Sequence, residues 1–290
     1  MTEKINSFLH DVKRMTDVEI EQALVNSEPL IDGLYKSAIY STTGGKRLRA
    51  VFTILVGNIF KVEQEILLKT AAAVELIHAA SLIMDDLPYM DDSQLRRGKP
   101  SNHVVFGQDV ALCASIALLS KAIELVLNDD ALKQDIKTKI VQVLADSYGF
   151  KGLAAGQFVD LKLKRKNVSF DVIEYINDKK TAALFSAAGK AGAIIGNASN
   201  KQINAIDEYS KFMGLAFQIV DDILDVEGNK DIVGKDVAHD KMNFVRLVGL
   251  ENARNKAKEY TDLAVKSLEI LGPDAEVLKE FTSFLVKRVS

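Results

Sequence analysis

Two short acidic segments carry the residue types that bind divalent cations. They span residues 85–92 and 221–225, and each follows an apolar run with helical spacing. Partly buried carboxylates are costly unless they are paired or coordinated. Oxygen ligands without a nearby Cys suit a hard cation, so both segments are predicted to bind Mg²⁺, the alternative being solvated helix ends.

The spacing within each segment indicates how its carboxylates converge. Asp221 and Asp225 are four residues apart and share one helical face, where they repel each other unless a cation lies between them. Pro88 is expected to end its helix near Asp86. The chain must then turn so that Asp91 faces back toward Asp85.

Basic residues stand in complementary places. The segment Gly44-Gly45-Lys46-Arg47-Leu48-Arg49 is predicted to open a helix after a glycine loop, which offers cations and backbone N–H groups to an anion. Arg96 and Arg97 follow the first acidic segment directly. Lys179 and Lys180 lie within a helical run, and the loop after the second acidic segment is flanked by Lys235 and Lys241. Acids that bind Mg²⁺ beside bases that bind anions predict a diphosphate site, whereas each basic pair alone would be surface charge.

Three polar positions in otherwise apolar helices add weaker signals. His78 lies seven residues before Asp85, two turns back on the same face, and is either a structural histidine or a substrate ligand. Gly156-Gln157 with Asp160, and Gln218 three residues before Asp221, are polar groups of the same kind.

The elements that position these residues are helices. Apolar residues follow helical spacing almost throughout the chain, with breaks at residues 42–46, 88–97, 162–169, 196–201 and 228–239. Only four prolines and 17 glycines occur in 290 residues, where prolines alone usually make up about 5%. We therefore predict an all-α fold with ten or more helices in a single domain over residues 1–290.

Composition also limits the classes of function. The 37 basic and 40 acidic residues give a net charge of −3, which does not favour a nucleic-acid partner. The longest uncharged runs, at residues 50–60 and 110–120, are shorter than the roughly 18 residues of a membrane span. The N-terminal residues show no signal-peptide core, so we expect a cytoplasmic protein, with Cys113 buried and inert.

Taken in order, the motifs resemble those of the trans-isoprenyl diphosphate synthases. They are Gly45-Lys46-Arg47-Leu48-Arg49, Ile77-His78-Ala79-Ala80-Ser81-Leu82, the two acidic segments, Arg96-Arg97-Gly98, Gly156-Gln157, Lys180-Thr181, Phe217-Gln218 and Gly234-Lys235-Asp236. The resemblance covers nearly the whole chain, and residues 75–121 are most similar to bacterial geranylgeranyl diphosphate synthases. It implies an isoprenoid-synthase helical bundle around a central cavity, usually as a homodimer, and condensation of isopentenyl diphosphate with an allylic diphosphate.

The resemblance also implies a role for each matched residue. Three Mg²⁺ ions, for which Mn²⁺ can substitute, would be held by Asp85 and Asp91 and by Asp221. The allylic diphosphate would be bound by Arg96, Lys180 and Lys235. Isopentenyl diphosphate would be bound by Lys46, Arg49, His78 and Arg97. The backbone carbonyls of Lys180 and Thr181 and the side chain of Gln218 would steady a carbocation.

The small residues Ala80 and Ser81 indicate the product. In the family, bulk just before the first acidic segment closes the pocket for the growing chain, and two small side chains leave it deep. We predict a twenty-carbon product, geranylgeranyl diphosphate. The alternatives are a farnesyl diphosphate synthase, a longer-chain synthase, a terpene cyclase or a regulatory subunit, although the last usually lacks motif aspartates and this chain keeps them.

Overall fold

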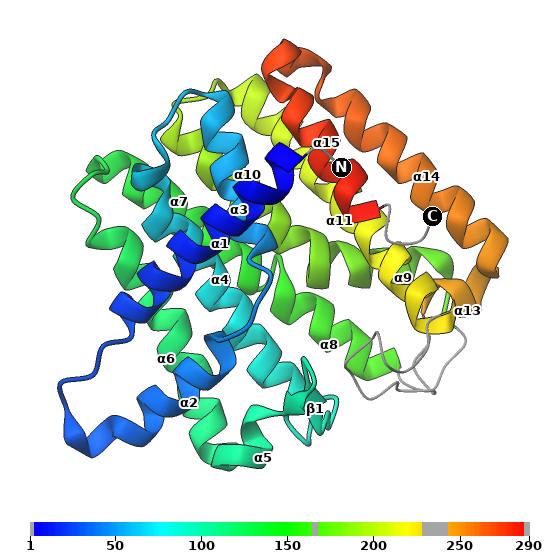
Figure 1. Ribbon diagram of the computed structural model, residues 1–290. Coiled ribbons are helices and arrows are strands. Elements are labelled where there is room, and N and C mark those ends of the chain that lie inside the picture. Colours follow the sequence, from blue (N-terminus) through cyan, green and yellow to red (C-terminus); the bar gives the residue numbers. More distant parts are fainter. Residues whose placement is uncertain (1–2, 164–167, 228–242, 287–290) are drawn as a thin grey trace. The chain divides into compact units, whose positions relative to one another are not determined.

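The computed structural model describes residues 3–163, 168–227 and 243–286 (Figure 1). Helices dominate this part of the chain, and one two-stranded hairpin accompanies them. The all-α prediction with ten or more helices is confirmed. The described residues form two compact units, residues 3–144 and residues 145–286 with the gaps given, and each is described by itself. The single domain and the central cavity stay predictions.

In the first unit the central helix is α4 (Gln64–Asp86), which is buried on nearly all sides. It packs against α6, α3, α1 and α2. A helix that is apolar all round belongs in a core, and the alanines of α4 let its neighbours approach closely. The elements of this unit are α1 (Glu3–Ala23), η1 (Pro29–Ile31), α2 (Asp32–Thr42), α3 (Leu48–Ile59), α4, β1 (Leu95–Arg96), β2 (Lys99–Pro100), α5 (Asn102–Phe106), α6 (Gln108–Leu127) and the first part of α7 (Gln134–Tyr148).

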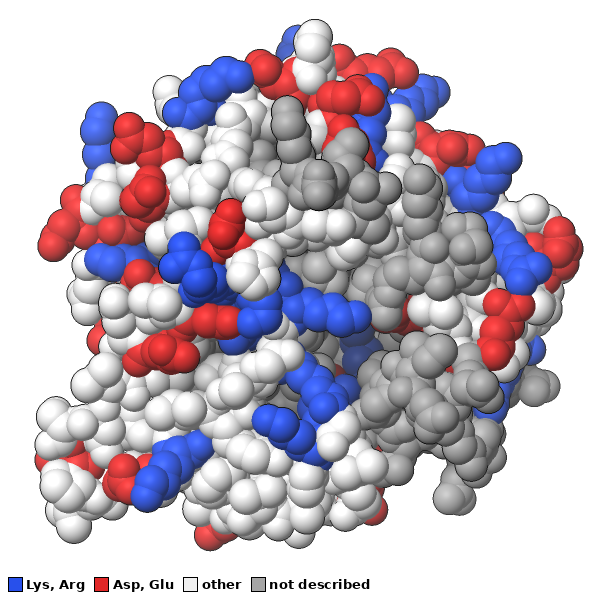
Figure 2. Space-filling model, in the orientation of Figure 1, with Lys and Arg blue, Asp and Glu red and all other residues white. Residues whose placement is uncertain are grey.

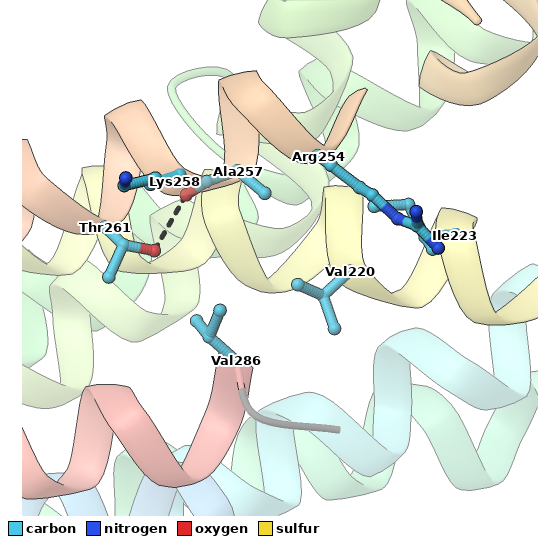
Figure 3. A pocket seen from close by; sticks show the side chains of 7 residues that line it. All are labelled: Val220, Ile223, Arg254, Ala257, Lys258, Thr261 and Val286. Atoms are coloured by element: carbon cyan, nitrogen blue, oxygen red, sulfur yellow. Dashed lines mark hydrogen bonds between the residues drawn. The ribbon is translucent and has the colours of Figure 1, made fainter. Parts of the chain in front are cut away.

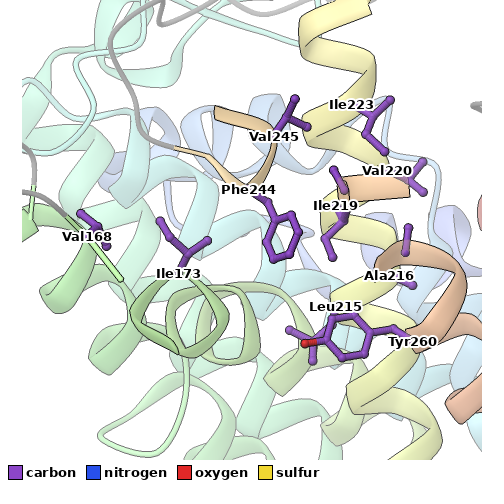
Figure 4. Close-up of a cluster of buried hydrophobic side chains, with 12 residues drawn as sticks. Val168, Ile173, Leu215, Ala216, Ile219, Val220, Ile223, Phe244, Val245 and Tyr260 are labelled. Atoms are coloured by element: carbon purple, nitrogen blue, oxygen red, sulfur yellow. The ribbon is translucent and has the colours of Figure 1, made fainter. Parts of the chain in front are cut away.

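In the second unit the long helix α11 (Asn200–Glu227) packs against α14, α10 and the π-helical turn η2 (Asp178–Ala182). A cluster of buried side chains fills the space around α11, with Phe244 and Tyr260 as its largest members (Figure 4). Phe170 meets Phe244 edge to face with ring centroids 5.3 Å apart. The other elements are α8 (Leu153–Leu163), α9 (Phe170–Asn177), α10 (Ala183–Ile195), α13 (Phe244–Val248), α14 (Leu250–Ser267), η3 (Glu269–Ala275) and α15 (Glu276–Val286).

Helix α6 presents an apolar face to solvent. Leu112, Ile116 and Leu127 are 39%, 59% and 43% exposed, and Cys113 between them is exposed as well. The prediction of a buried Cys113 is therefore wrong. The helix is apolar on more than one face, and within the described residues α4, α2 and α5 pack against it and leave this face open.

Length and composition alone would let α4 and α6 cross a membrane. The apolar window of α4 is 72% buried within the protein, as in a core helix, whereas that of α6 is only 33% buried. The absence of a membrane span stays a prediction. Packing within the protein does not account for the exposed apolar face of α6.

On the face shown in Figure 2, acidic and basic side chains both occur widely, as a net charge of −3 leads one to expect.

Candidate functional site

The first acidic segment forms a tight turn at the end of α4. Helix α4 ends at Asp86, and Leu87 before Pro88 is extended, with φ −60° and ψ 149°. The chain then folds back so that the Asp91 N–H donates to the Asp85 carbonyl oxygen over 2.9 Å. The predicted helix end and the return of Asp91 to Asp85 are both confirmed.

The neighbouring aspartate has another partner. Asp86 is buried, and the Arg96 guanidinium donates from Nε to both Asp86 carboxylate oxygens over 3.1 Å and from its terminal nitrogen as well. Burial alone would lower the pKa of Arg96, but the hydrogen bond and charge of Asp86, with Asp85 and Asp91, raise it. Asp86 therefore holds a cation in place, beside the carboxylates of Asp85 and Asp91.

The β1–β2 hairpin brings a second arginine to the same unit. Arg97 stands at its tip with φ 53°, and its guanidinium donates to the Thr43 carbonyl oxygen over 3.4 Å. Arg97 thus approaches the loop before α3, which carries Lys46, and the first turn of α3 carries Arg49. The structure brings these sequence-distant cations together in unit 1.

His78 lies among these cations. It is partly exposed on α4, two turns before Asp85. Burial lowers the pKa of His78 well below its usual range, and the charges of Arg49, Arg97, Arg96 and Arg47 lower it further. The imidazole is therefore neutral near pH 7, and a neutral imidazole has one N–H to donate.

A cavity of about 270 Å³ lies beside these groups in unit 1. Side chains of α2 and α4 and the β1–β2 hairpin form its walls. Its lining residues are Tyr40, Ser41, Thr43, Gly44, Leu82, Ile83, Asp86, Arg96, Arg97, Lys99, Pro100 and Asn102. The cavity is polar on the arginine side and apolar at Leu82 and Ile83, as suits an amphiphilic ligand.

In unit 2, Lys180 and Thr181 lie in the π-helical turn η2, between α9 and α10. Glycines from two other helices lie directly against this turn. A Cβ built on Gly156 of α8 would be 2.9 Å from the Lys180 backbone nitrogen, and one on Gly214 of α11 would be 2.7 Å from Ala182 Cα. Only glycine allows both helices to approach the turn so closely. π-turns occur often at functional sites.

A chain of hydrogen bonds fixes the polar groups around η2. The Thr181 hydroxyl donates to Gln218 Oε1 over 2.8 Å, and Gln218 Nε2 donates to Asp222 Oδ1 over 3.0 Å. Asp222 Oδ2 accepts from the Phe244 N–H over 2.9 Å. Lys180 Nζ meets Asp160 Oδ2 at 2.7 Å. Hydrogen bonds therefore connect Thr181 and Gln218 to the second acidic segment. The sequence alone could not predict this connection.

The members of the second acidic segment differ in environment. Asp222 is buried, and burial raises its pKa to about 6 against the opposing hydrogen bonds from Phe244 and Gln218. The negative charges of Asp225 and Asp221 contribute to the same rise. Asp221 and Asp225 are partly exposed on α11. Asp222 thus anchors the segment from inside, and its two neighbours are the accessible carboxylates.

The donor set suits Mg²⁺ bound together with a ligand. Among the described residues, no three acidic, histidine or cysteine side chains converge as a metal cage would require. In unit 1 the turn joins the main chains of Asp85 and Asp91, and the charges of both act on Arg96, which is engaged by Asp86. Mg²⁺ commonly takes one or two carboxylates and completes its shell with water and substrate phosphate oxygens. These residues therefore fit the predicted ion.

A second cavity, of about 210 Å³, lies in unit 2 between α11, α14 and α15 (Figure 3). Its walls are mainly apolar, and Arg254 at its edge pairs with Glu227 over 2.5 Å. The lining residues are Val220, Ile223, Arg254, Ala257, Lys258, Thr261 and Val286. Within the described part of the chain, its lining includes no carboxylate and none of the predicted site residues.

The contacts that hold several of the site residues could not be predicted from the sequence. Asp86 holds Arg96, and Asp160 holds Lys180 from another helix. Asp222 holds Gln218 from within the second acidic segment. Gly214 supports η2 but is one of many small residues in an apolar helix. The predicted ligand Lys235 lies outside the described residues, as does Lys241.

Comparisons with known proteins agree with these motifs. Residues 32–271 match the polyprenyl synthetase family. The chain is 35% identical to a farnesyl diphosphate synthase of Bacillus subtilis over 99% of both chains. It is 38% identical to geranylgeranyl pyrophosphate synthase 7 of Arabidopsis thaliana, over 92% of this chain and 76% of that one.

A solved structure shows the same fold. A geranyltransferase from Helicobacter pylori, complexed with magnesium and isoprenyl diphosphate, superposes with a TM-score of 0.88 at 27% identity. The alignment covers 99% of this chain and 98% of the other. The family predicted from the motifs is confirmed, and the chain belongs to the polyprenyl synthetase family.

Proposed function

We propose that the chain is a prenyltransferase that condenses isopentenyl diphosphate with an allylic diphosphate, head to tail, to give geranylgeranyl diphosphate. Prenyl-chain elongation follows from the family and from relatives named farnesyl and geranylgeranyl synthases. The observation that carries the proposal is the acidic turn of unit 1, in which Asp91 returns to Asp85 beside the arginine held by Asp86.

The acidic residues are proposed as ligands for three Mg²⁺ ions, or Mn²⁺ in their place. Asp85 and Asp91 would hold two ions and Asp221 the third. When bound, the metal neutralises negative charge on the departing diphosphate. The Helicobacter pylori structure, which contains magnesium and isoprenyl diphosphate, supports the choice of ion.

The basic residues bind the two diphosphates. Arg96 is proposed to bind the allylic diphosphate, and the bidentate grip of Asp86 holds its guanidinium in position before substrate arrives. Lys180 and Lys235 share this role; Lys180 is held by Asp160 and would exchange that partner for phosphate oxygens. Isopentenyl diphosphate is bound by Lys46, Arg49, His78 and Arg97, with the neutral His78 donating one hydrogen bond.

The π-turn serves the carbon chemistry. Breaking the allylic C–O bond leaves positive charge on carbon, which oriented dipoles stabilise when they are fixed beforehand. Thr181 and Gln218 are fixed by their mutual hydrogen bond and by Asp222. The isopentenyl double bond then attacks the cation, and the released diphosphate accepts the proton that is lost.

The chain length depends on α4 just before the acidic turn. Ser81 is partly exposed on α4, and its small side chain donates to the His78 carbonyl oxygen over 2.8 Å. Ala80 is fully buried, and its carbonyl oxygen accepts from the Ser115 hydroxyl of α6 over 2.9 Å. Two small residues here support a twenty-carbon product rather than the fifteen-carbon product of a farnesyl synthase.

We also propose that two copies of the chain associate through the outer face of α6. Leu112, Ile116 and Leu127 share one face of the helix and are exposed, and a two-fold axis would bury the same patch on both copies. Light scattering after gel filtration should give a dimer for the wild type and a monomer for Ile116→Asp. Co-sedimentation of the wild type with lipid vesicles would instead favour a membrane as the cover. A cytoplasmic location remains part of the proposal.

The activity is tested by incubating the protein with radiolabelled isopentenyl diphosphate, farnesyl diphosphate and Mg²⁺. The expected product is geranylgeranyl diphosphate, and omission of isopentenyl diphosphate should abolish product formation. Hydrocarbon release from geranylgeranyl diphosphate alone would indicate a terpene cyclase instead. Products beyond twenty carbons would indicate a longer-chain synthase.

A further inference from the structure

Unit 1 contains two oppositely charged side chains that are almost completely buried. Arg47 is 4% exposed and Glu75 is 3% exposed, with Arg47 Nη1 3.8 Å from Glu75 Oε2. Burial of such charges is costly unless each has partners. Arg47 also donates from Nε to Asp17 Oδ1 over 2.6 Å and to the Thr42 carbonyl oxygen. The network joins α1, the end of α2, the loop before α3, and α4.

Glu75 performs the task of a helix cap from another helix. Arg47 is the N-cap residue of α3, and its side chain has no acceptor for the first free N–H groups of the helix. Glu75 Oε1 accepts from the backbone N–H of Arg49 and of Ala50, both over 3.1 Å. A capping side chain normally bonds these same N2 and N3 positions. Glu75 thus fixes the first turn of α3, which carries Arg49.

Arg47 holds the loop in an unusual backbone conformation. Its φ of 56° and ψ of 33° are left-handed, which costs a residue with a Cβ of the order of 1–2 kcal/mol. The contacts of its guanidinium with Asp17, Thr42 and Glu75 compensate for that cost. Arg47 points inward, into these contacts. The cations of this segment that are assigned to a ligand are its neighbours Lys46 and Arg49.

Glu75 also balances charge around the loop. A Cβ on Gly45 would lie 2.7 Å from Arg47 Nη1 and 3.4 Å from Arg97 Nη1, so both guanidinium groups lie beside Gly45. Burial lowers the pKa of Arg97, and the charge of Glu75 opposes that change. Without Glu75, two arginines would face each other with only Asp17 as a nearby counter-charge among the described contacts of Arg47.

We infer that Glu75 and Arg47 are positioning residues for the isopentenyl diphosphate site: together they set the first turn of α3, and with it Arg49, and Glu75 balances the charge of Arg97 beside the loop. Neither of the two needs to touch the substrate. The inference rests on the proposed function. It predicts that replacing either residue weakens binding of isopentenyl diphosphate more than binding of the allylic diphosphate, because the latter is assigned to Arg96 and Lys180.

The test compares Glu75→Gln with Glu65→Gln, a matched control on the exposed face of the same helix. Steady-state kinetics give the KM for each substrate and kcat, and calorimetry measures binding of isopentenyl diphosphate alone. For Glu75→Gln we expect the KM and Kd for isopentenyl diphosphate to rise about tenfold, the effect of one lost charge-assisted interaction. The KM for the allylic substrate should stay within about twofold of the control.

A second variant covers the case in which Glu75→Gln does not fold. Arg47→Lys keeps the positive charge but replaces the planar guanidinium, whose three nitrogens face Asp17, Thr42 and Glu75, with a single ammonium nitrogen, and should raise the same KM. The inference is overturned if the KM values for isopentenyl diphosphate and for the allylic substrate rise equally in these variants, or if both values match those of Glu65→Gln. In either case the proposed function still stands if the wild type elongates the allylic primer. A folded wild type that neither binds isopentenyl diphosphate nor elongates a primer overturns both.

Discussion

Replacing Gly156 by alanine tests whether the π-turn must be held in place for catalysis. The new Cβ would lie 2.8 Å from Lys179 Cβ, and 2.9 Å from both the Lys180 backbone nitrogen and Lys180 Cγ. Two of these atoms lie close to the main chain, so a side-chain rotation cannot relieve the contact. Either α8 or η2 must shift, and Lys180 moves with η2.

The expected loss of stability is small. Overpacking of this kind costs about 1–3 kcal/mol, and alanine recovers about 0.5–1 kcal/mol through its higher helix propensity. The net cost is about 1 kcal/mol, which lowers Tm by about 2–4 °C in a domain of this size. The expected loss of activity is larger, because a displacement of about 1 Å at a reacting group can cost about a hundredfold in rate.

The assay measures Tm and kcat/KM for the allylic substrate in Gly156→Ala and in Gly33→Ala. Gly33 lies in α2, and a Cβ added there would have no atom within 4 Å, so its replacement should leave both quantities unchanged or raise Tm slightly. We expect at least a tenfold fall in kcat/KM for Gly156→Ala alone, which is about 1.4 kcal/mol of transition-state stabilisation. Equal activity of the two variants, with equal Tm values, would refute the role given to this contact.

Two further predictions concern the product and the pH. Ala80→Tyr should shorten the product toward fifteen carbons with some loss of Tm, because the fully buried Ala80 packs beside α6; an unchanged chromatographic profile would contradict the pocket assignment. The raised pKa of Asp222 means that its protonated carboxyl stabilises the folded state. In Mg²⁺-free buffer this contribution to the free energy of unfolding should be fully present below about pH 4 and should be lost as the pH rises to about 6. A shift of the pKa from 3.8 to about 6 corresponds to about 3 kcal/mol. The free energies of unfolding of the wild type and of Asp222→Asn, measured with denaturant, should therefore depend differently on pH between about pH 4 and pH 6. Parallel pH dependences would contradict this prediction.

Local rules explain what could be predicted from the sequence. Pro88 restricts the residue before it and ends the helix, so the return of Asp91 to Asp85 was accessible from the spacing alone. The helical content was equally accessible, because apolar periodicity is a local pattern. The π-helical turn η2 was not, since it lies inside a continuous helical run and has no distinctive residue pattern.

Contacts between distant residues account for most of the rest. Nothing in the sequence pairs Asp86 with Arg96 rather than with a metal, or Lys180 with Asp160, because each pairing depends on how separate elements pack. Cys113 shows the corresponding ambiguity of apolar helices. An apolar helix face can belong to the core or to an interface between chains, and the face with Cys113 is open to solvent.

The acidic turn of unit 1 is proposed to support Mg²⁺-dependent condensation. The most direct measurement compares wild type and Asp85→Ala in the formation of labelled geranylgeranyl diphosphate from farnesyl and isopentenyl diphosphates. Circular dichroism and Tm show whether both proteins are folded. We expect Mg²⁺-dependent product from the wild type and none from a folded Asp85→Ala. Near-normal turnover by Asp85→Ala would contradict the account.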